Sequence, residues 1–136
     1  EINIGMVADI GTLQRLPNLI PLGLMKELAF TGRKMYSEEA LKSGLLNNIY
    51  YDQKKLINNV YKIAKDISLN SPIAVSGTKK IIKYSLEHNI SDSLDYVALW
   101  NSSMLQSSDF IEAVSAQIEK RKAKFDDIRP PPKFDR

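Results

Sequence analysis

The clearest hydrophobic pattern in the chain lies between residues 52 and 69, where apolar positions return every three or four residues. This spacing places side chains on one face of an α-helix. Lysines and asparagines fill the positions in between. The pattern therefore predicts an amphipathic helix over residues 52–69. Its apolar face is formed by Leu56, Val60, Ile63, Ala64 and Ile67.

Helical patterns continue to the end of the chain. Ser71 followed by Pro72 is typical of a helix start, because serine can accept the capping hydrogen bond and proline fits the first turn. We expect this helix to run toward His88 and to end at Asn89. The remaining segments are predicted as helices over 91–108 and 108–125, the second entered through Ser108 and Asp109, and a proline-rich, non-helical tail over 128–136.

The first part of the chain has shorter patterns that glycine and proline interrupt. A strand fits residues 2–7 better than a helix, because Gly5 disfavours regular helix. The other predicted segments are short helices over 11–20 and 21–32, a compact helix from a Ser37 cap to Gly44, and a strand over 45–51.

The predicted elements divide the chain into residues 1–51, which are mixed, and residues 52–136, which are nearly all helical. The apolar positions of the helical part are wider than one narrow stripe, so something must cover them. The helices could cover one another as a four-helix module, or they could form a subunit interface. The positions concerned include Leu94, Val97, Ala98, Trp100 and Leu105.

The composition of the chain limits the kinds of functional site that it can form. The 136 residues are 43% hydrophobic and 26% charged, which is ordinary for a globular domain. The absence of cysteine excludes disulfides and cysteine-based catalysis, and one histidine without nearby ligands predicts no metal site. No apolar run reaches the roughly 18 residues of a membrane span. The net charge of +3 includes a basic cluster of Lys120, Arg121, Lys122 and Lys124, which without interleaved aromatic residues is weak evidence for nucleic-acid binding.

Two acids stand out in the opening segment. Glu1 and Asp9 are separated by residues that are apolar or small except for Asn3. Fully extended, this segment would hold the two acids roughly 26 Å apart, so the chain must bend at glycine if they share a site. Asp9 could instead cap a helix that begins at Gly11.

Several blocks of sequence together resemble the crotonase family of enoyl-CoA hydratases and isomerases. They are GTLQRLP, ELAFTGR, EEALKSGLL, SP with a lysine seven residues after the proline, and DFIEA followed after four residues by IEKRKAKF. The resemblance implies an α/β, crotonase-like fold with a spiral core of repeated ββα units, partly present, and a C-terminal all-α trimerisation region, so that this chain is mostly helical. It covers the family's C-terminal half, and we expect the chain to begin at an active-site residue, with the glycine-rich oxyanion loops upstream.

The residues around Asp9 resemble one branch of the family in particular. Hydratases usually have a PGAGGT pattern where this chain has VADIG, and an Asp eight residues after the Glu resembles the branch that converts 3,5-dienoyl-CoA to 2,4-dienoyl-CoA. By this resemblance Asp9 removes a proton from carbon 2 and Glu1 protonates carbon 6. Moving two double bonds requires protons to leave and arrive several bonds apart, which suits two separate acids. An enoyl-CoA hydratase, or a non-catalytic acyl-CoA-binding protein, is the alternative.

The resemblance also implies partners. The substrate would carry coenzyme A, no separate cofactor is expected, and Lys120 would approach the nucleotide phosphate of coenzyme A. The family forms trimers or hexamers in mitochondria or peroxisomes, and neither nucleic acid nor a membrane is expected as a partner. The chain ends in KFDR, which is not an SKL-type peroxisomal signal.

Overall fold

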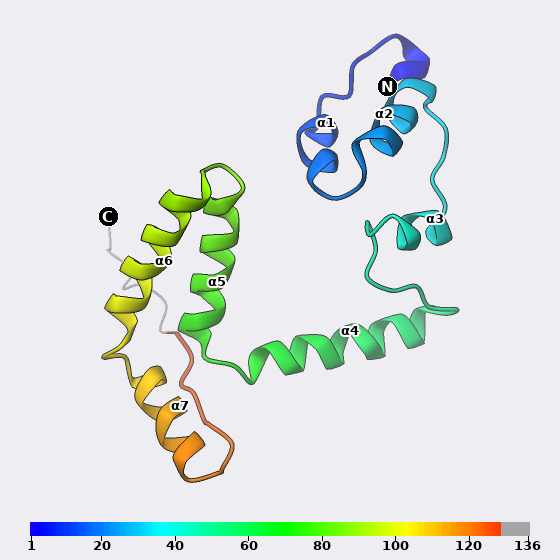
Figure 1. Ribbon diagram of the computed structural model, residues 1–136. Helices are drawn as coiled ribbons and strands as arrows, with labels where there is room; N and C mark the ends of the chain where they lie inside the picture. The colour runs from blue at the N-terminus through cyan, green and yellow to red at the C-terminus, as the bar shows by residue number, and fades with distance from the viewer. Residues whose placement is uncertain (129–136) are drawn as a thin grey trace, which may run out of the picture. The chain divides into compact units, whose positions relative to one another are not determined.

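The computed structural model describes residues 1–128 of the protein. The chain divides into two compact units, Glu1–Asn58 and Asn59–Arg136, and the division falls within one helix. Figure 1 shows the elements of each unit, and all regular elements within residues 1–128 are helices. The predicted non-helical tail lies outside the described residues apart from Ile128.

The first unit is built around one ten-residue helix, α2. In chain order its elements are η1 (Ile2–Ile4), α1 (Thr12–Arg15), η2 (Leu16–Asn18), α2 (Leu22–Thr31) and α3 (Ser37–Lys42), where η marks a 3₁₀ helix. Helix α2 contacts both η1 and η2. It ends at Gly32, where the helix predicted over 21–32 also ends, and this glycine has a left-handed φ of 62°. The buried apolar residues of this unit are Ile20, Met25 and Ala40.

Three predictions for the first unit were wrong. Residues 2–7 form η1 and a turn rather than a strand, and residues 45–51 contain no regular element. A strand needs a partner strand for its backbone N–H and C=O groups, and residues 1–128 offer none. Ser37 is the first residue of α3 rather than its cap, because Tyr36 occupies the N-cap position.

The second unit follows the helical predictions more closely. Helix α4 (Gln53–Ser68) bridges the two units, and α5 (Pro72–Ser85), α6 (Ile90–Met104) and α7 (Ser108–Ile118) follow it. Ser71 caps α5 as predicted, since its Oγ accepts a hydrogen bond from the Ala74 N–H at 3.1 Å. Asn89 was assigned wrongly: its side chain caps the start of α6 instead of ending α5, which stops at Ser85. Helix α7 is capped by Ser107, one residue before the predicted start.

Helices α5 and α6 pack side by side (Figure 1), and the Trp100 side chain of α6 lies against Gly77 of α5. A Cβ at this position would lie 2.6 Å from Cε2 of Trp100, so only glycine lets the indole rest on the α5 backbone. The ring centroid of Trp100 lies 6.3 Å from that of Tyr96, and the centroid of Tyr96 lies 4.6 Å from that of Tyr84. The His88 ring stacks on Tyr84 with a centroid distance of 3.6 Å. A row of rings therefore follows the α5–α6 seam.

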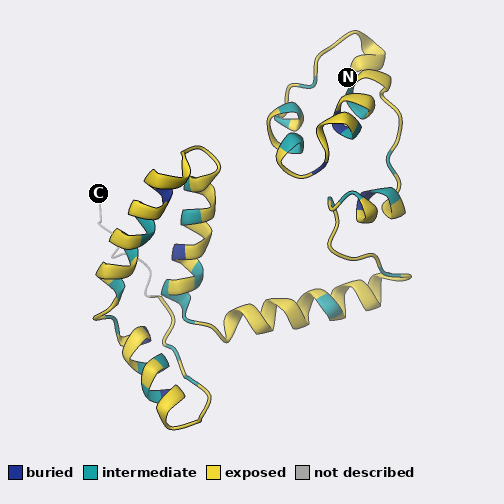
Figure 2. Ribbon diagram, in the orientation of Figure 1, coloured by how far each residue is buried: buried dark blue, intermediate teal, exposed yellow. Residues whose placement is uncertain are grey.

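Most of the described residues are exposed (Figure 2), and they include many large apolar side chains. The predicted apolar face of helix α4 is confirmed. It is exposed, because α4 has no buried residue. Val60, Ile63 and Ile67 are each about half exposed. None of the helices in this part of the chain has the length and apolar character needed to cross a membrane.

Candidate active site

The segment that carries Glu1 folds back on itself within six residues. The Glu1 carbonyl oxygen accepts hydrogen bonds from the N–H groups of Ile4 at 3.0 Å and Met6 at 3.1 Å. Gly5 makes this possible with a φ of 74°, a conformation that costs other residues more. The chain between the two acids therefore bends at Gly5, a glycine at which the sequence allowed a bend.

Glu1 lines an apolar pocket of about 280 Å³ within the first unit. The walls come from η1, α1 and α2, and Glu1 is the single ionisable residue among the lining residues. The apolar walls include Ile2, Met6, Leu13, Leu16, Met25, Leu28 and Phe30. A carboxyl group at the edge of such a pocket can exchange a proton with an apolar ligand while few other polar groups compete for it.

The pocket depends on a close contact between η1 and the end of α2. A Cβ on Gly32 would lie 2.8 Å from both Asn3 Oδ1 and Ile2 Cγ2, which real side chains do not tolerate without movement. Gly32 also has a positive φ, so two independent constraints require glycine there. The residue after Glu1 thus rests directly on the Gly32 turn.

Asp9 does not join Glu1 in this pocket. Its side chain is exposed, and it is not among the lining residues, although its neighbours Val7 and Ala8 are. It does not cap α1 either, because the N-cap is Gly11 with a φ of 90°. Within the first unit, Glu1 therefore lines the apolar cavity and Asp9 does not, and both residues are exposed.

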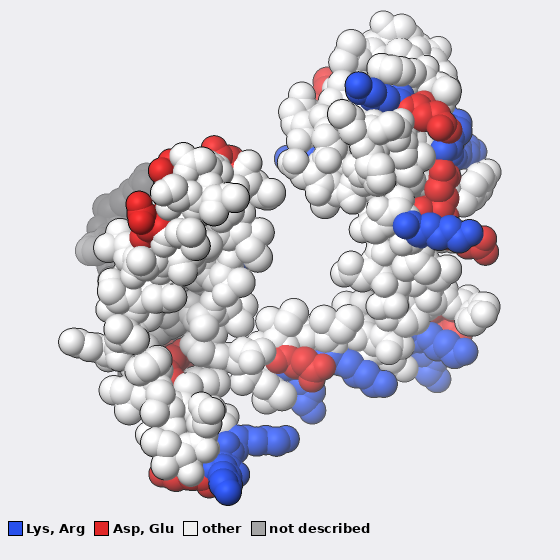
Figure 3. Space-filling model, viewed as in Figure 1, with Lys and Arg blue, Asp and Glu red and all other residues white. Residues whose placement is uncertain are grey.

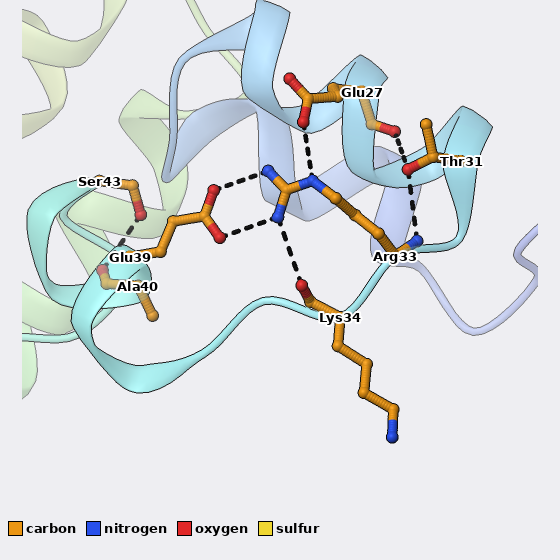
Figure 4. Close-up of polar contacts among 7 residues, drawn as sticks. All are labelled: Glu27, Thr31, Arg33, Lys34, Glu39, Ala40 and Ser43. Atoms are coloured by element: carbon orange, nitrogen blue, oxygen red, sulfur yellow. Dashed lines mark hydrogen bonds and ion pairs between the residues drawn. The ribbon is translucent and has the colours of Figure 1, made fainter.

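An ion-pair network beside the pocket was not anticipated from the sequence. Arg33 donates from Nε to Glu27 at 2.7 Å and, through both terminal nitrogens, to Glu39 at 2.8 and 2.6 Å (Figure 4). These hydrogen bonds hold the pKa of Glu39 below its usual range and raise the pKa of Arg33. The signal was the spacing: a glutamate stands six residues before and six residues after the arginine, across a helix end.

Lys120 has an unusual backbone conformation. Its φ of 53° is the one positive value among the non-glycine residues that the structure describes. It follows the end of α7, where the N–H of Arg121 bonds to the Ala116 carbonyl at 3.0 Å, as in a helix-ending turn that usually has glycine at this position. The side chain predicted to meet coenzyme A is therefore presented from a strained turn.

The basic cluster around Lys120 is not uniform. Arg121 pairs with Glu112 at 2.6 Å and with Glu119 at 2.5 Å, and the Lys124 N–H bonds to Glu112 at 2.8 Å. The Arg121 hydrogen bond is the main reason that the pKa of Glu112 falls to about 2. Arg121 thus connects the turn after α7 to Glu112 and Glu119. Figure 3 shows Lys and Arg atoms gathered at this end of α7 and over α4.

The second unit contains a pocket of about 420 Å³ between α5, α6 and α7. Asp109 lies on its wall with only 7% of its surface exposed. Its Oδ2 accepts a hydrogen bond from Ser71 Oγ at 2.5 Å, which joins the first turns of α5 and α7. Among residues 1–128, no group of three His, Cys, Asp or Glu side chains is arranged to hold a metal ion.

Solved structures identify the fold. The enoyl-CoA hydratase from Bacillus anthracis superposes with a TM-score of 0.86 at 29% identity, over 91% of this chain and 48% of that one. EchA1, an enoyl-CoA hydratase from Mycobacterium marinum, gives 0.84 at 30% identity over 92% and 49%. The fold is thus that of the crotonase class. Residues 1–129 match the enoyl-CoA hydratase/isomerase family, and the chain belongs to this family.

Curated relatives are more similar in sequence than these structures are. The chain is 47% identical over 125 residues to the mitochondrial Delta(3,5)-Delta(2,4)-dienoyl-CoA isomerase of Rattus norvegicus, over 91% of this chain and 38% of the relative. It is 46% identical to the peroxisomal enzyme of that name from Arabidopsis thaliana, over 92% of this chain and 45% of the relative. The chain therefore spans less than half the length of these relatives.

Proposed function

We propose that the intact protein isomerises 3,5-dienoyl-CoA to 2,4-dienoyl-CoA. The observation that carries this proposal is the identity of 46–47% to dienoyl-CoA isomerases from an animal and a plant, against about 30% to the solved hydratases. The substrate carries coenzyme A, and the reaction uses no separate cofactor. Glu1 provides its acid and Asp9 its base. The apolar pocket beside Glu1 supports the role of Glu1, because an acyl chain needs apolar walls, and the role of Asp9 rests on the resemblance of its sequence surroundings.

The reaction is a proton transfer at each end of the diene. The Asp9 carboxylate takes a proton from carbon 2, and the electrons of that bond move into the thioester to give an enolate. The enolate electrons then shift the double bonds, and the carbon 6 end takes a proton from the Glu1 carboxylic acid. Asp9 ends protonated and Glu1 ionised, so proton exchange with water restores both groups. The substrate gains and loses one proton, which is an isomerisation.

The proposal is tested with the intact protein and 3,5-dienoyl-CoA, because conjugation changes ultraviolet absorbance. Asp9→Asn removes the base and should lower kcat at least roughly 100-fold with little change in KM. Glu1→Gln should block product formation but still exchange the carbon 2 proton with deuterated solvent, because the enolate can form and return. Hydration of 2-enoyl-CoA without any conjugated product would replace the isomerase with a hydratase. Exchange that survives in Asp9→Asn and disappears in Glu1→Gln would reverse the two roles.

We also propose that Lys120 contacts a phosphate of the coenzyme A nucleotide. The strained turn supports this role, because a lysine occupies a position that glycine would take up with less strain. A nucleotide phosphate would gain a charge-assisted hydrogen bond from the ammonium group. The contact should affect binding of the nucleotide portion and leave the chemical step unchanged.

The intact protein is further proposed to form trimers, which can pair into hexamers. The support is the exposed apolar surface of the helical part, where Leu94, Leu99 and Ile118 are 62%, 67% and 76% exposed. Apolar surface of this extent is usual for subunit interfaces and unusual for a free helical unit. Light scattering of the intact protein tests this proposal, and a well-folded monomer at micromolar concentration would contradict it.

A further inference from the structure

The ion-pair network around Arg33 lies one residue from the turn on which the Glu1 segment rests. We propose that Arg33 is a positioning residue for Glu1, fixing the Gly32 turn so that the Glu1 carboxyl group stays at the apolar pocket. This inference rests on the proposed function, in which Glu1 delivers a proton to the far end of the diene.

The guanidinium group of Arg33 links two helices. Its three donor nitrogens engage two carboxylates from different elements, Glu27 in α2 and Glu39 in α3 (Figure 4). The pairing with Glu39 is bidentate, which fixes the guanidinium plane as well as its position. A single ammonium group cannot reproduce this fork. Arg33 therefore sets the path of the chain between α2 and α3.

Hydrogen bonds of Thr31 connect Arg33 to the end of α2. The Arg33 N–H donates to Thr31 Oγ1 at 3.3 Å, and that hydroxyl donates to the Glu27 carbonyl at 2.7 Å (Figure 4). Residues on both sides of Gly32 are thus bonded to the last turn of the helix. The left-handed conformation of Gly32 is held between them.

The Gly32 turn contacts the segment that carries Glu1. The side chains of Ile2 and Asn3 pack so closely on Gly32 that a methyl group there would displace them, and Glu1 and Gly32 both line the same pocket. A movement of the Gly32 turn must therefore move η1 or open a gap beneath it. Since a misplacement of about 1 Å at a reacting group can cost about 100-fold in rate, small displacements matter here.

The network fits a positioning role better than a stabilising one. The side chains of Arg33, Glu27 and Glu39 are 34%, 55% and 36% exposed. Ion pairs with this exposure contribute little to folding stability. Their contribution is then the geometry that the fork imposes, and the proposed reaction supplies a reason for that geometry.

The experiment compares Arg33→Lys and Arg33→Gln in the intact protein, with Glu38→Gln as the matched control. Glu38 is an exposed acid in the same first turn of α3 as Glu39, and it has no partner in this network. Two rates are measured with 3,5-dienoyl-CoA: exchange of the carbon 2 proton with deuterated solvent, and formation of the conjugated product. Exchange of the carbon 2 proton requires only the proposed base, Asp9, whereas formation of the conjugated product requires Glu1 as well.

Both Arg33 variants should lower product formation relative to exchange by about tenfold or more, with KM nearly unchanged. Glu39→Gln should act in the same direction, because it removes the bidentate acceptor, while Glu38→Gln should leave the ratio as in the wild type. A general loss of structure would reduce exchange and product formation together, so the ratio separates positioning from stability. Arg33→Lys keeps the charge and covers the case in which Arg33→Gln does not fold.

An unchanged ratio in Arg33→Lys, with the wild type active, would overturn the inference and leave the proposed function standing. A wild type that forms no conjugated product would remove the proposed function instead. In that case hydrogen exchange of the Ile4 and Met6 amides still tests the coupling, because both donate to the Glu1 carbonyl. Unchanged protection of these amides in Arg33→Gln would show that the network does not hold η1.

Discussion

Replacing Ser71 with alanine should destabilise the protein far more than the usual loss of a helix cap. The Ser71 hydroxyl makes two hydrogen bonds: it accepts from the Ala74 N–H at 3.1 Å and donates to the Asp109 carboxylate at 2.5 Å. Loss of a serine cap costs about 1 kcal/mol. Asp109 is 7% exposed, so the loss of its donor adds about 2 kcal/mol, as for hydrogen bonds to charged groups. The expected total is about 3 kcal/mol.

The matched control is Ser107→Ala. Ser107 caps α7 through the Phe110 N–H at 3.2 Å and lines the same pocket, and its hydroxyl is not bonded to Asp109. Its removal should therefore cost only about 1 kcal/mol. Urea unfolding of the intact protein, followed by the fluorescence of Trp100 in the same pocket, measures both changes. With an m-value of about 2 kcal/mol/M, Ser71→Ala should lower the midpoint by about 1.5 M and Ser107→Ala by about 0.5 M.

Equal midpoints for the two serine variants would refute this reasoning, because they would mean that the Asp109 carboxylate loses nothing with its donor. A double-mutant cycle with Asp109→Asn adds a direct measure of coupling. The coupling with Ser71→Ala should be on the order of 1 kcal/mol or more, and that with Ser107→Ala should be smaller.

Three further outcomes are expected. Gly77→Ala should destabilise by about 1–3 kcal/mol in thermal unfolding because its Cβ meets the α6 indole, whereas Gly23→Ala, which meets nothing within 4 Å, should be neutral or stabilising. Lys120→Gly should raise Tm, because glycine relieves the left-handed strain. The same variant should raise KM for the coenzyme A thioester about tenfold and leave KM for a pantetheine thioester unchanged. Equal effects on both substrates would contradict the phosphate contact. The stabilisation from the Glu112–Arg121 pair should be constant above the unfolded pKa of 4.5 and disappear as pH falls through about 2, so that Glu112→Gln flattens the acid limb of the stability profile.

The fold could be predicted from the sequence where local signals were sufficient. The helix over 52–69 follows from its periodicity, and the Ser71 cap and the Gly32 stop follow from the chemistry of those residues. A strand over 2–7 was predicted because Gly5 disfavours regular helix, and a second strand was predicted over 45–51. A strand is completed by its neighbour, however, and the described residues contain none. Asn89 illustrates a further limit, because asparagine suits both the end of one helix and the start of the next.

The candidate site was predictable in part for a similar reason. Glu1 could be placed beside apolar residues because those residues are its sequence neighbours. The contact of η1 with Gly32 joins residues about thirty positions apart, and no spacing rule for a single helix or strand reports such a contact. The network around Arg33 was missed for a different reason: it crosses the end of one helix and the start of the next, where helical spacing no longer applies.

The row of rings along the α5–α6 seam gives the protein an internal optical reporter. Tyr96 lies 6.3 Å from Trp100, and Tyr84 lies 4.6 Å from Tyr96. At such distances, light absorbed by the tyrosines is passed to the indole by resonance energy transfer and emitted there. Tyr96 and Trp100 both lie on α6, so separation of α5 from α6 would move only Tyr84 away from the other two rings. A rise in the emission of Tyr84 therefore follows this seam without any added label.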